Sequence, residues 1–507
     1  MPRQSRRDFL KLAAVAAASA AFGRYLPLSS TKKLLQKKDG RNNTIVLVFD
    51  AMSASHMSLY GYPRKTTPNL EKHAEHATVY HTHYSAANFT VPGTSSLLTG
   101  THPWTHRAVN FSGLIARDFA RNNIFQTLND EYHTFAFSQN IWATNLLHQF
   151  SDQVDTLLPS SSFSALSMLA NEGFANDPIN SFQAYDNFMF DFIDSPGSLG
   201  FGLAHRILFE WKKGKMFKGG YALQPRNYAM AFKLGDVIDN VIKTLSNLES
   251  PYLAYVHIFS PHAPYRPRRD FIGIFDNDEW KPPRKPLHTF TEGEMHETVE
   301  KYRLLYDEYI ANVDYEIGRI MDAFQERGIT DTSHILITSD HGELLERGVK
   351  GHVTPLLYEP LVRIPLTIFS PGQNSRKDVF TPTSSVDILP TLLQLAGRDA
   401  PAWAEGQVLP EFGGLGDSQR PIFFLEAKSS SSFGKLTTAT FAMRKGDYKI
   451  IMYRGYDAYG KDVFELYELK KDPEEVNDLY AEDSEIAIQL QKEVTEKFDG
   501  INQPHNS

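Results

Sequence analysis

The amino-acid sequence predicts an α/β fold whose centre is a large, mixed but mostly parallel β-sheet flanked by helices. Three runs rich in apolar and β-branched residues, 44–49, 252–259 and 334–339, are typical of strands that are covered on both faces. The segment 309–327 carries apolar residues at spacings of three and four, which is typical of an amphipathic helix, and Gly328 follows it as a stop. Buried strands and a packed helix are the elements of such a fold.

Each of the three runs leads into residues that could carry chemistry. Asp50 follows the first run, His262 follows the second between two prolines, and Asp340 with His341 follows the third. In open α/β sheets, ligands bind outside the carboxyl ends of the strands. An Asp at a strand end can also cap the next helix. A second acid at a second strand end, joined directly to a His, argues against chance, so we expect these residues to form a site.

The segment 88–100, NFTVPGTSSLLTG, presents a hydroxyl at a turn that opens a helix. Thr90 carries the hydroxyl, Pro92 fixes the backbone after it, and Gly93 permits a tight bend before the first helical turn. The free N–H groups and partial positive charge of a helix N-terminus would favour an anion beside Thr90. Taken alone, the pattern also fits an ordinary capped helix.

Length, charge and cysteine content limit the class of protein. A chain of 507 residues can bury at least one large core and a smaller second lobe. The formal net charge of −8 gives no sign of a surface for nucleic acid. The sequence has no cysteine, which excludes disulfides, thiolate metal ligands and a lipoprotein anchor.

The N-terminus is predicted to be an export signal. Residues 5–11, SRRDFLK, match the twin-arginine pattern, the Ala-rich run 12–21 provides a modest apolar region, and 18–20 fits the pattern of a cleavage site. The run is far shorter than the roughly 20 apolar residues that span a membrane. We therefore expect residues 1–30 to be a signal peptide read by the twin-arginine export machinery. The mature protein would be periplasmic or extracellular and would lack a transmembrane segment.

The middle of the chain, about 151–243, is rich in aromatic residues and reads as an insertion. One interpretation is that it walls the mouth of the active site and selects the substrate. Peripheral helices without contact to substrate are an equally good interpretation. A surface that contacts membrane lipid is a third one.

The segment around Thr90 resembles the signature of the sulfatases, which belong to the alkaline phosphatase superfamily. That signature starts with a Cys or Ser nucleophile, has Pro two positions later and Arg four positions later, and ends in Leu-Thr-Gly. Here these positions are Thr90, Pro92, Thr94 and 98–100. Thr90 cannot be oxidised to the formylglycine that sulfatases make from Cys or Ser, and Thr94 cannot supply the Arg that steadies it. The resemblance therefore implies the family's fold without its usual chemistry.

Other segments extend the resemblance over roughly 42–145 and 250–480. They imply an alkaline phosphatase-like catalytic domain over 42–400, interrupted by the insertion, and a smaller C-terminal α+β lobe over 401–495. The segments that carry the likeness are Asp50, 59–62, 66–70, the PHAPY loop 261–265, Asp340 with His341, 350–366, 385–397, 443–449 and 465–473.

The resemblance implies a metal site in the catalytic domain, with the ligands Asp50, Thr90, Asp340 and His341. Oxygen-rich sites with one imidazole suit Mn, Ca, Mg or Zn, and the sequence does not choose among them. Two-metal members of the superfamily carry a further Asp four residues before a His. That position before His262 is Ile258, so we expect one divalent ion.

The resemblance also implies groups that contact the substrate. His262 or His352 would protonate the leaving oxygen, and the other would bind the non-bridging oxygens together with Lys350. In the phosphonate monoester hydrolase and choline sulfatase branch, an Asn near this spacing contacts the substrate, and the resemblance implies that role for Asn110. The alternatives are a solvated basic turn for Lys350 and His352, a surface turn for Asn110, and simple packing for His106.

These residues favour an exported, metal-dependent hydrolase or transferase that acts on phosphate or phosphonate esters through Thr90. A phosphothreonine can be hydrolysed or passed to an acceptor, whereas a threonine sulfate has no comparable exit. The first alternative is a sulfuric ester hydrolase that works without formylglycine. The second is a non-catalytic binding protein with the sulfatase fold, which a costly cluster of buried acids argues against. The substrate is expected to be a small-molecule or cell-envelope ester.

Overall fold

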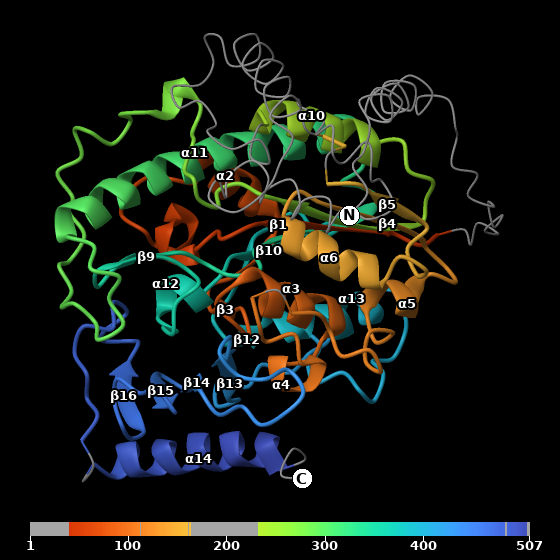
Figure 1. The fold of residues 1–507 in the computed structure, drawn as a ribbon. Coiled ribbons are helices and arrows are strands. Elements are labelled where there is room, and N and C mark those ends of the chain that lie inside the picture. The colour runs from red at the N-terminus through yellow and green to blue at the C-terminus, as the bar shows by residue number, and fades with distance from the viewer. Residues whose placement is uncertain (1–39, 112, 161, 164–231, 482–483, 504–507) are drawn as a thin grey trace, which may run out of the picture.

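The computed structural model describes residues 40–111, 113–160, 162–163, 232–481 and 484–503, and it confirms the predicted fold class (Figure 1). The predicted signal peptide and residues 164–231 of the predicted insertion lie outside the described residues. The domain boundaries at 400 and 401 stay a prediction.

A mixed sheet of eight strands forms the centre of the described chain, in the order β11-β2-β10-β7-β1-β6-β4-β5. Neighbouring strands run parallel except at β10, which is antiparallel to both β7 and β2. β1 therefore lies inside the sheet, between β7 and β6. The strands are β1 (Asn43–Phe49), β2 (Thr78–Tyr80), β4 (His133–Ser138), β5 (Thr156–Leu158), β6 (Tyr252–Ile258), β7 (Ser333–Thr338), β10 (Leu366–Phe369) and β11 (Lys377–Val379).

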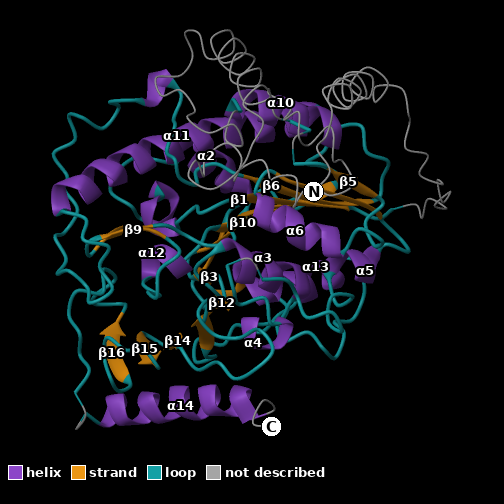
Figure 2. Cartoon of the chain, viewed as in Figure 1, coloured by secondary structure: helices purple, strands orange, loops and turns teal. Residues whose placement is uncertain are grey.

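Helices cover both faces of this sheet, so that it is the middle of three layers (Figures 1 and 2). The side chains of β1 alternate between the two cores: Ile45, Leu47 and Phe49 pack with the helices on one face, and Val46 and Val48 with those on the other. The first face carries α2 (Pro68–His73), α10 (Leu234–Leu245) and α11 (His296–Glu326), and the second carries α3 (Thr90–Thr99), α5 (Ile124–Leu128), α6 (Ile141–Gln149) and α13 (Ile388–Leu395).

The predicted amphipathic helix is the C-terminal part of α11. It ends at Glu326 and is followed by Gly328 in the left-handed region, as the sequence indicated. Its N-terminus lies at His296, thirteen residues before the predicted start at 309, because the first turns are only partly covered and lack a continuous apolar stripe. The extended part buries Tyr306, whose hydroxyl contacts the end of β1.

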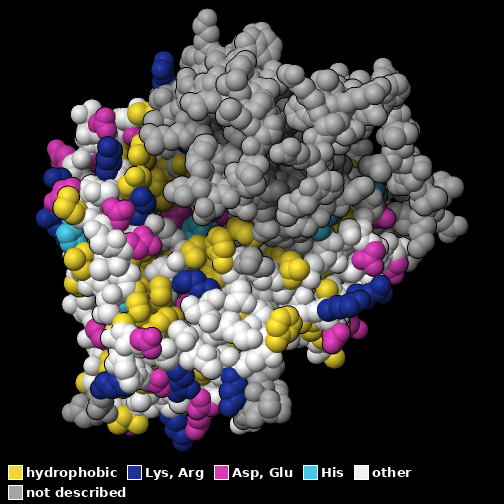
Figure 3. Space-filling view, in the orientation of Figure 1, with side chains coloured by type: hydrophobic (Ala, Val, Ile, Leu, Met, Phe, Trp, Pro, Cys, Tyr) yellow, Lys and Arg dark blue, Asp and Glu magenta, His cyan; other side chains and the backbone are white. Residues whose placement is uncertain are grey.

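A smaller lobe at the C-terminal end contains an antiparallel sheet, β13 (Ile422–Glu426), β14 (Ala439–Lys445), β15 (Tyr448–Arg454) and β16 (Val463–Glu468), with α14 (Glu485–Asn502) packed on it. Lys449 of β15 is fully buried, and its ammonium lies 3.1 Å from Glu359 and 2.9 Å from Glu475. This ion cluster joins the lobe to the larger domain. On the face that Figure 3 shows, basic and acidic side chains are intermixed over the lobe.

Short elements complete the described chain, and none of its helices is both long enough and apolar enough to cross a membrane. The remaining elements are β3 (His83–Tyr84) paired with β12 (Thr383–Ser384), β8 (Leu344–Glu346) paired with β9 (Val349–Gly351), α4 (Pro103–His106), α12 (Glu359–Val362), and the 3₁₀ turns Ala54–His56, Ser58–Tyr60, Ala74–His76, Arg269–Phe271 and Ser385–Asp387.

Gly93 lies within α3 rather than at a bend, and its small size lets the helix approach the end of β7. A Cβ atom on Gly93 would lie 2.3 Å from the carbonyl oxygen of Asp340, which no side chain can tolerate without a backbone shift. The contact fixes the first turn of α3, which carries Thr90, against the turn that carries Asp340.

We expect Gly93→Ala to lower the free energy of unfolding by about 1–3 kcal/mol, because the added methyl group overpacks a backbone contact. Urea unfolding would measure it. Gly500→Ala, in α14 with no heavy atom within 4 Å of the new Cβ, is the control and should be neutral or stabilising by up to about 1 kcal/mol. A Gly93→Ala protein as stable as the parent would contradict this account.

Candidate active site

The carboxyl ends of three neighbouring strands bring together two carboxylates and an imidazole. Asp50 follows β1, Asp340 lies two residues after β7, and His257 is the next-to-last residue of β6. All three side chains are fully buried. One ligand atom of each lies within 4.8 Å of the other two, so the three groups surround one point.

The atoms that face this point have no hydrogen-bond partner among the described residues. They are Oδ1 of Asp50, Nε2 of His257 and Oδ2 of Asp340. A buried polar atom without a partner costs about 1–3 kcal/mol, and more when the group is charged. Carboxylate oxygens and an imidazole nitrogen are ligands of divalent cations, and a cation would satisfy all three atoms. The donor set therefore fits one divalent metal ion.

The two carboxylates respond differently to their burial. Burial raises the pKa of Asp50, but the charges of His262, His257 and His341 lower it by more, so that this pKa lies well below its usual range. Burial and the neighbouring charge of Asp50 raise the pKa of Asp340 above its ordinary value. Burial lowers the pKa of His257, but the charges of Asp340 and Asp50 outweigh it and raise the pKa. The cluster is thus an electrostatically coupled unit that favours positive charge at its centre.

The turn after Asp50 places a backbone N–H beside the second carboxylate, Asp340. Ala51 has φ of 59°, in the left-handed region that residues other than glycine rarely adopt. The Tyr306 hydroxyl donates to the Ala51 carbonyl and accepts from the backbone N–H of Ser53 at 3.0 Å. In this conformation the Ala51 N–H points at Oδ1 of Asp340, 3.3 Å away. Tyr306 thus stabilises a strained turn that supports the carboxylate pair.

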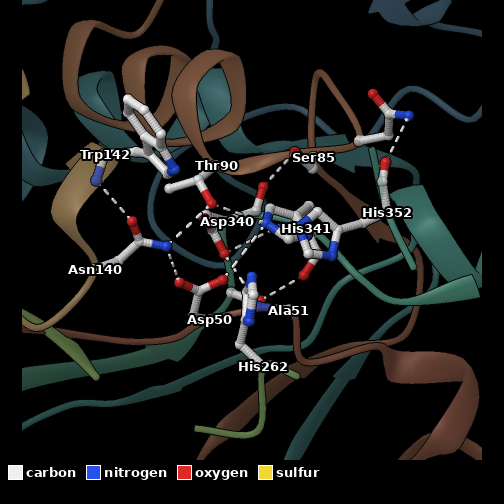
Figure 4. A network of polar contacts seen from close by, with 12 residues as sticks. Asp50, Ala51, Ser85, Thr90, Asn140, Trp142, His262, Asp340, His341 and His352 are labelled. Carbon is white, nitrogen blue, oxygen red and sulfur yellow. Dashed lines mark hydrogen bonds and ion pairs between the residues drawn. The ribbon is translucent and has the colours of Figure 1, made fainter. Parts of the chain in front are cut away.

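Thr90 is the first residue of α3, and its hydroxyl faces the cluster. Its Oγ1 lies 3.2 Å from Nε2 of His341 (Figure 4). The other ring nitrogen of His341 lies 2.8 Å from the Gly342 carbonyl, which can only accept, so Nδ1 carries the proton and Nε2 presents a lone pair to Asp50, Asp340 and Thr90. Burial lowers the pKa of His341, which favours this neutral form. The predicted ligands therefore lie together, and the role of Thr90 as a ligand stays a prediction.

Asn140 links the nucleophile candidate to the first carboxylate. It follows β4 and caps α6 by accepting from the Trp142 N–H through Oδ1. Its amide nitrogen donates to Oδ2 of Asp50 at 2.5 Å and to Oγ1 of Thr90 at 3.2 Å. Because the cap fixes the amide, both acceptors are held in a defined orientation.

His262 and His352 lie on the other side of the cluster (Figure 4). Their ring centroids are 4.7 Å apart, and the His352 ring is 4.3 Å from that of His341. Nδ1 of His352 lies 3.1 Å from Oε1 of the fully buried Glu343. Nδ1 of His262 lies 2.6 Å from the Ala263 carbonyl. Both imidazoles are thus held through Nδ1, which leaves Nε2 to act on a substrate.

Lys350 is not brought to this cluster in the structure. Its ammonium lies 3.6 Å from Glu294 and 4.0 Å from the centroid of the Tyr302 ring. The chain turns at Gly351, whose φ is 138°, so His352 and Lys350 do not follow the regular alternation of one strand. Its catalytic role stays a prediction.

Asn110 and His106 are engaged in structural contacts. The amide nitrogen of Asn110 donates to the carbonyls of Lys428 and Ser430 at 2.9 and 2.7 Å, which ties it to a loop of the C-terminal lobe. Nε2 of the buried His106 lies 3.0 Å from Oγ of Ser96, and burial lowers the pKa of His106 to about 3. His106 is therefore a packed histidine, and a role of Asn110 in substrate binding stays a prediction.

Reasoning from the sequence missed His257 and Asn140. His257 lies inside an apolar run that reads only as a buried strand, although a polar side chain next to the end of such a strand was a usable signal. Asn140 follows the strand β4, whose segment 133–138 contains a single β-branched residue, Thr134, and is therefore a weaker strand signal than the three runs named above.

Comparisons with known proteins agree with this architecture. The family described as "Sulfatase" matches residues 42–398, and the family described as "N-sulphoglucosamine sulphohydrolase, C-terminal" matches 353–503. A choline-sulfatase of Rhizobium meliloti (strain 1021) is 28% identical over 251 residues, which are 45% of this chain and 46% of that protein. An arylsulfatase of Clostridium perfringens is 21% identical over 473 residues, 86% of this chain and 90% of that protein. The match to the choline-sulfatase thus spans less than half of its length.

Solved structures share the fold over almost the whole chain. The phosphonate monoester hydrolase of Silicibacter pomeroyi superposes with a TM-score of 0.63 at 20% identity and covers 91% of this chain and 95% of that one. The phosphonate monoester hydrolase of Agrobacterium radiobacter has a TM-score of 0.61 at 18% identity, with coverages of 92% and 96%. At these identities the likeness concerns the fold.

From the repulsion between Asp50 and Asp340 we expect the stability of the protein to rise when a divalent metal ion binds. In metal-free buffer, Asp340→Asn should raise the melting temperature, because it removes a charge that burial and Asp50 make unfavourable. Mn²⁺ at a hundred times its dissociation constant should stabilise the parent by about 2.7 kcal/mol. The variant should lose most of this gain. Differential scanning calorimetry with and without Mn²⁺ would measure both changes, and equal Mn²⁺ stabilisation of parent and variant would contradict the assignment.

Proposed function

The chain belongs to the sulfatase family, and on this basis we propose that it is a metal-dependent hydrolase or transferase of phosphate or phosphonate esters with Thr90 as its nucleophile. The observation that carries the proposal is the position of the Thr90 hydroxyl. It stands at the N-terminus of α3, 3.2 Å from both His341 and Asn140, at the edge of a buried carboxylate pair.

The proposed ligands of one divalent ion, which would be Mn, Ca, Mg or Zn, are Asp50, Thr90, Asp340 and His341. When bound, such an ion would lower the pKa of the Thr90 hydroxyl and neutralise negative charge on the ester. The protein's own contribution is orientation. Asn140 donates to Thr90 Oγ1 and thereby directs the remaining lone pair of this oxygen toward the substrate.

In the proposed reaction, the Thr90 hydroxyl loses its proton to solvent, and its Oγ1 attacks the phosphorus and forms a new P–O bond while the bond to the leaving oxygen breaks. His262 or His352 gives its Nε2 proton to that oxygen, and the other imidazole binds a non-bridging oxygen. Glu343 contacts Nδ1 of His352 and thereby holds the ring from the side away from Nε2. Water, or the hydroxyl of an acceptor, then attacks the phosphothreonine and gives its proton to the imidazole that protonated the leaving oxygen. The P–O bond to Thr90 breaks, and the released oxygen takes up a proton from solvent.

Two features of the site favour phosphorus over sulfur. Thr90 cannot become formylglycine, whose hydrate is the group that expels sulfate in the sulfatases. Thr94 stands where the signature has Arg, so the described site contains the imidazoles as its basic groups. A sulfuric ester hydrolase is the second candidate, because named sulfatases are among the relatives. A purely binding protein would have no need for two buried carboxylates, which are costly to keep.

We also propose that the protein is exported. Residues 5–11 supply the twin-arginine pattern, and the expected substrate is a small-molecule or cell-envelope ester.

Replacing Arg6 and Arg7 by Lys should retain the precursor in the cytoplasm, because the export machinery reads the arginine pair. Fractionation, with mass spectrometry of the mature N-terminus, would measure this. Export of the double variant at the parental level would contradict the prediction.

Thr90→Ala should reduce kcat on phosphorus esters by at least about a thousand-fold, because the attacking oxygen is lost. Aryl phosphodiester, aryl phosphonate and aryl sulfate esters would be assayed with added Mn²⁺ or Ca²⁺. Thr90→Ser keeps a hydroxyl on the same atom and should retain part of the activity. Turnover of the sulfate ester alone would establish the second candidate, and Thr90→Ala with parental turnover would exclude Thr90 as nucleophile.

A further inference from the structure

One hydroxyl behind the metal site has no part in the reaction described above. Tyr255 lies on β6 two residues before His257, so both side chains lie on the same face of the sheet. The Tyr255 side chain is fully buried, and its Oη lies 3.0 Å from Nδ1 of His257. The ring packs edge-on against Phe125, with 6.4 Å between centroids. Its hydroxyl is therefore held in place by the core.

The contact between Tyr255 and Nδ1 of His257 determines whether Nε2 of the same imidazole carries a proton or a lone pair. A neutral imidazole has one N–H and one lone pair. When Nδ1–H donates to the Tyr255 oxygen, Nε2 presents its lone pair to the two carboxylates, as a metal ligand must. Metal-binding histidines commonly donate their second N–H to such a partner, and the partner fixes both tautomer and ring orientation.

His341 shows the same arrangement with a different partner. Its Nδ1 lies 2.8 Å from the backbone carbonyl of Gly342, and its Nε2 faces the carboxylates. The two imidazoles thus face the same two carboxylates, one from β6 and one from the end of β7, and each is held through its Nδ1. Nε2 of His257 lies 3.3 Å from Asp50 Oδ2 and 3.8 Å from Asp340 Oδ2, and it is one of the three buried atoms without a hydrogen-bond partner in the described chain.

We propose that His257 is a ligand of the metal ion, and that Tyr255 is the positioning residue that holds its imidazole in the ligating orientation. The inference rests on the proposed function, because that function includes a bound divalent ion. It adds an imidazole from β6 to the ligands Asp50, Asp340 and His341.

The space around the Tyr255 hydroxyl agrees with this role. The side chain of Thr94 lies beside it, at the position where the sulfatase signature has Arg. A guanidinium there would bring a positive charge close to His257 and to an ion. Thr94 is fully buried and uncharged, so it brings no charge to the Tyr255 hydroxyl.

The test compares two tyrosines of the same strand. Tyr255→Phe removes only the hydroxyl that contacts His257. Tyr252→Phe, the matched control, removes a buried hydroxyl three residues earlier, whose partner is Ser333 at the other end of the sheet. Mn²⁺ binding to the purified protein is measured by isothermal titration calorimetry. Tyr255→Phe should weaken Mn²⁺ binding about 10–100-fold, and Tyr252→Phe should leave it within about two-fold.

A second variant tests the ligand itself. With Co²⁺ as the probe, His257→Asn should change the visible absorption of the bound ion, because a nitrogen ligand is lost. Parental Mn²⁺ affinity in Tyr255→Phe would overturn the role of Tyr255, and an unchanged Co²⁺ spectrum in His257→Asn would overturn the role of His257. If the parent binds neither ion, the proposed function fails as well. If it binds both but cleaves no ester, only the proposed function fails.

Discussion

The repulsion between two buried carboxylates is the constraint on which the rest of the site depends. Asp50 and Asp340 extend from adjacent strands, β1 and β7, and both are fully shielded from water. Two such charges cannot be kept together in a protein interior without compensation. The fold supplies compensation from several directions. Asn140 donates to Asp50, and the Ala51 N–H donates to Asp340. The imidazoles of His257 and His341 lie beside both carboxylates, where they would share a bound cation with them.

The layered architecture holds the groups that stabilise these charges in fixed positions. β1 lies in the interior of the sheet and has helices on both faces, so its carboxyl end is a rigid platform. α3 is pressed against the Asp340 turn because Gly93 lacks a side chain, and α11 reaches the Asp50 turn through Tyr306. Each layer therefore contributes one contact that fixes a functional group. Loss of any of them would disturb the geometry without removing a group that reacts.

Much of the fold and about half of the site could be predicted from the sequence. The strands of Asp50 and Asp340 are long apolar runs, and the polar residues after them stand out. His257 could not be found in this way, because the sequence of a buried strand does not tell which of its side chains face the site. Asn140 acts through its amide, and an Asn after a short strand is common in turns. For Lys350 the motif fixed the position in the chain, but the turn at Gly351 decides the direction of the side chain.

The same constraint supports a plain hydroxyl as the proposed nucleophile. A carboxylate pair that needs a cation at its centre creates a place where a neighbouring alkoxide is stabilised, and α3 delivers the Thr90 hydroxyl to that place with its helix N-terminus. A formylglycine is required only when the covalent intermediate must be broken by expelling sulfate from the carbon of the hydrate. At phosphorus the covalent product can be cleaved by a second attack in line with the Thr90 oxygen, so the side chain needs no chemistry beyond its own oxygen. Thr90 and Thr94 stand where the sulfatase signature has Cys or Ser and Arg. Under the proposed function, both differences fit a site built around a metal-supported alcohol instead of an aldehyde hydrate.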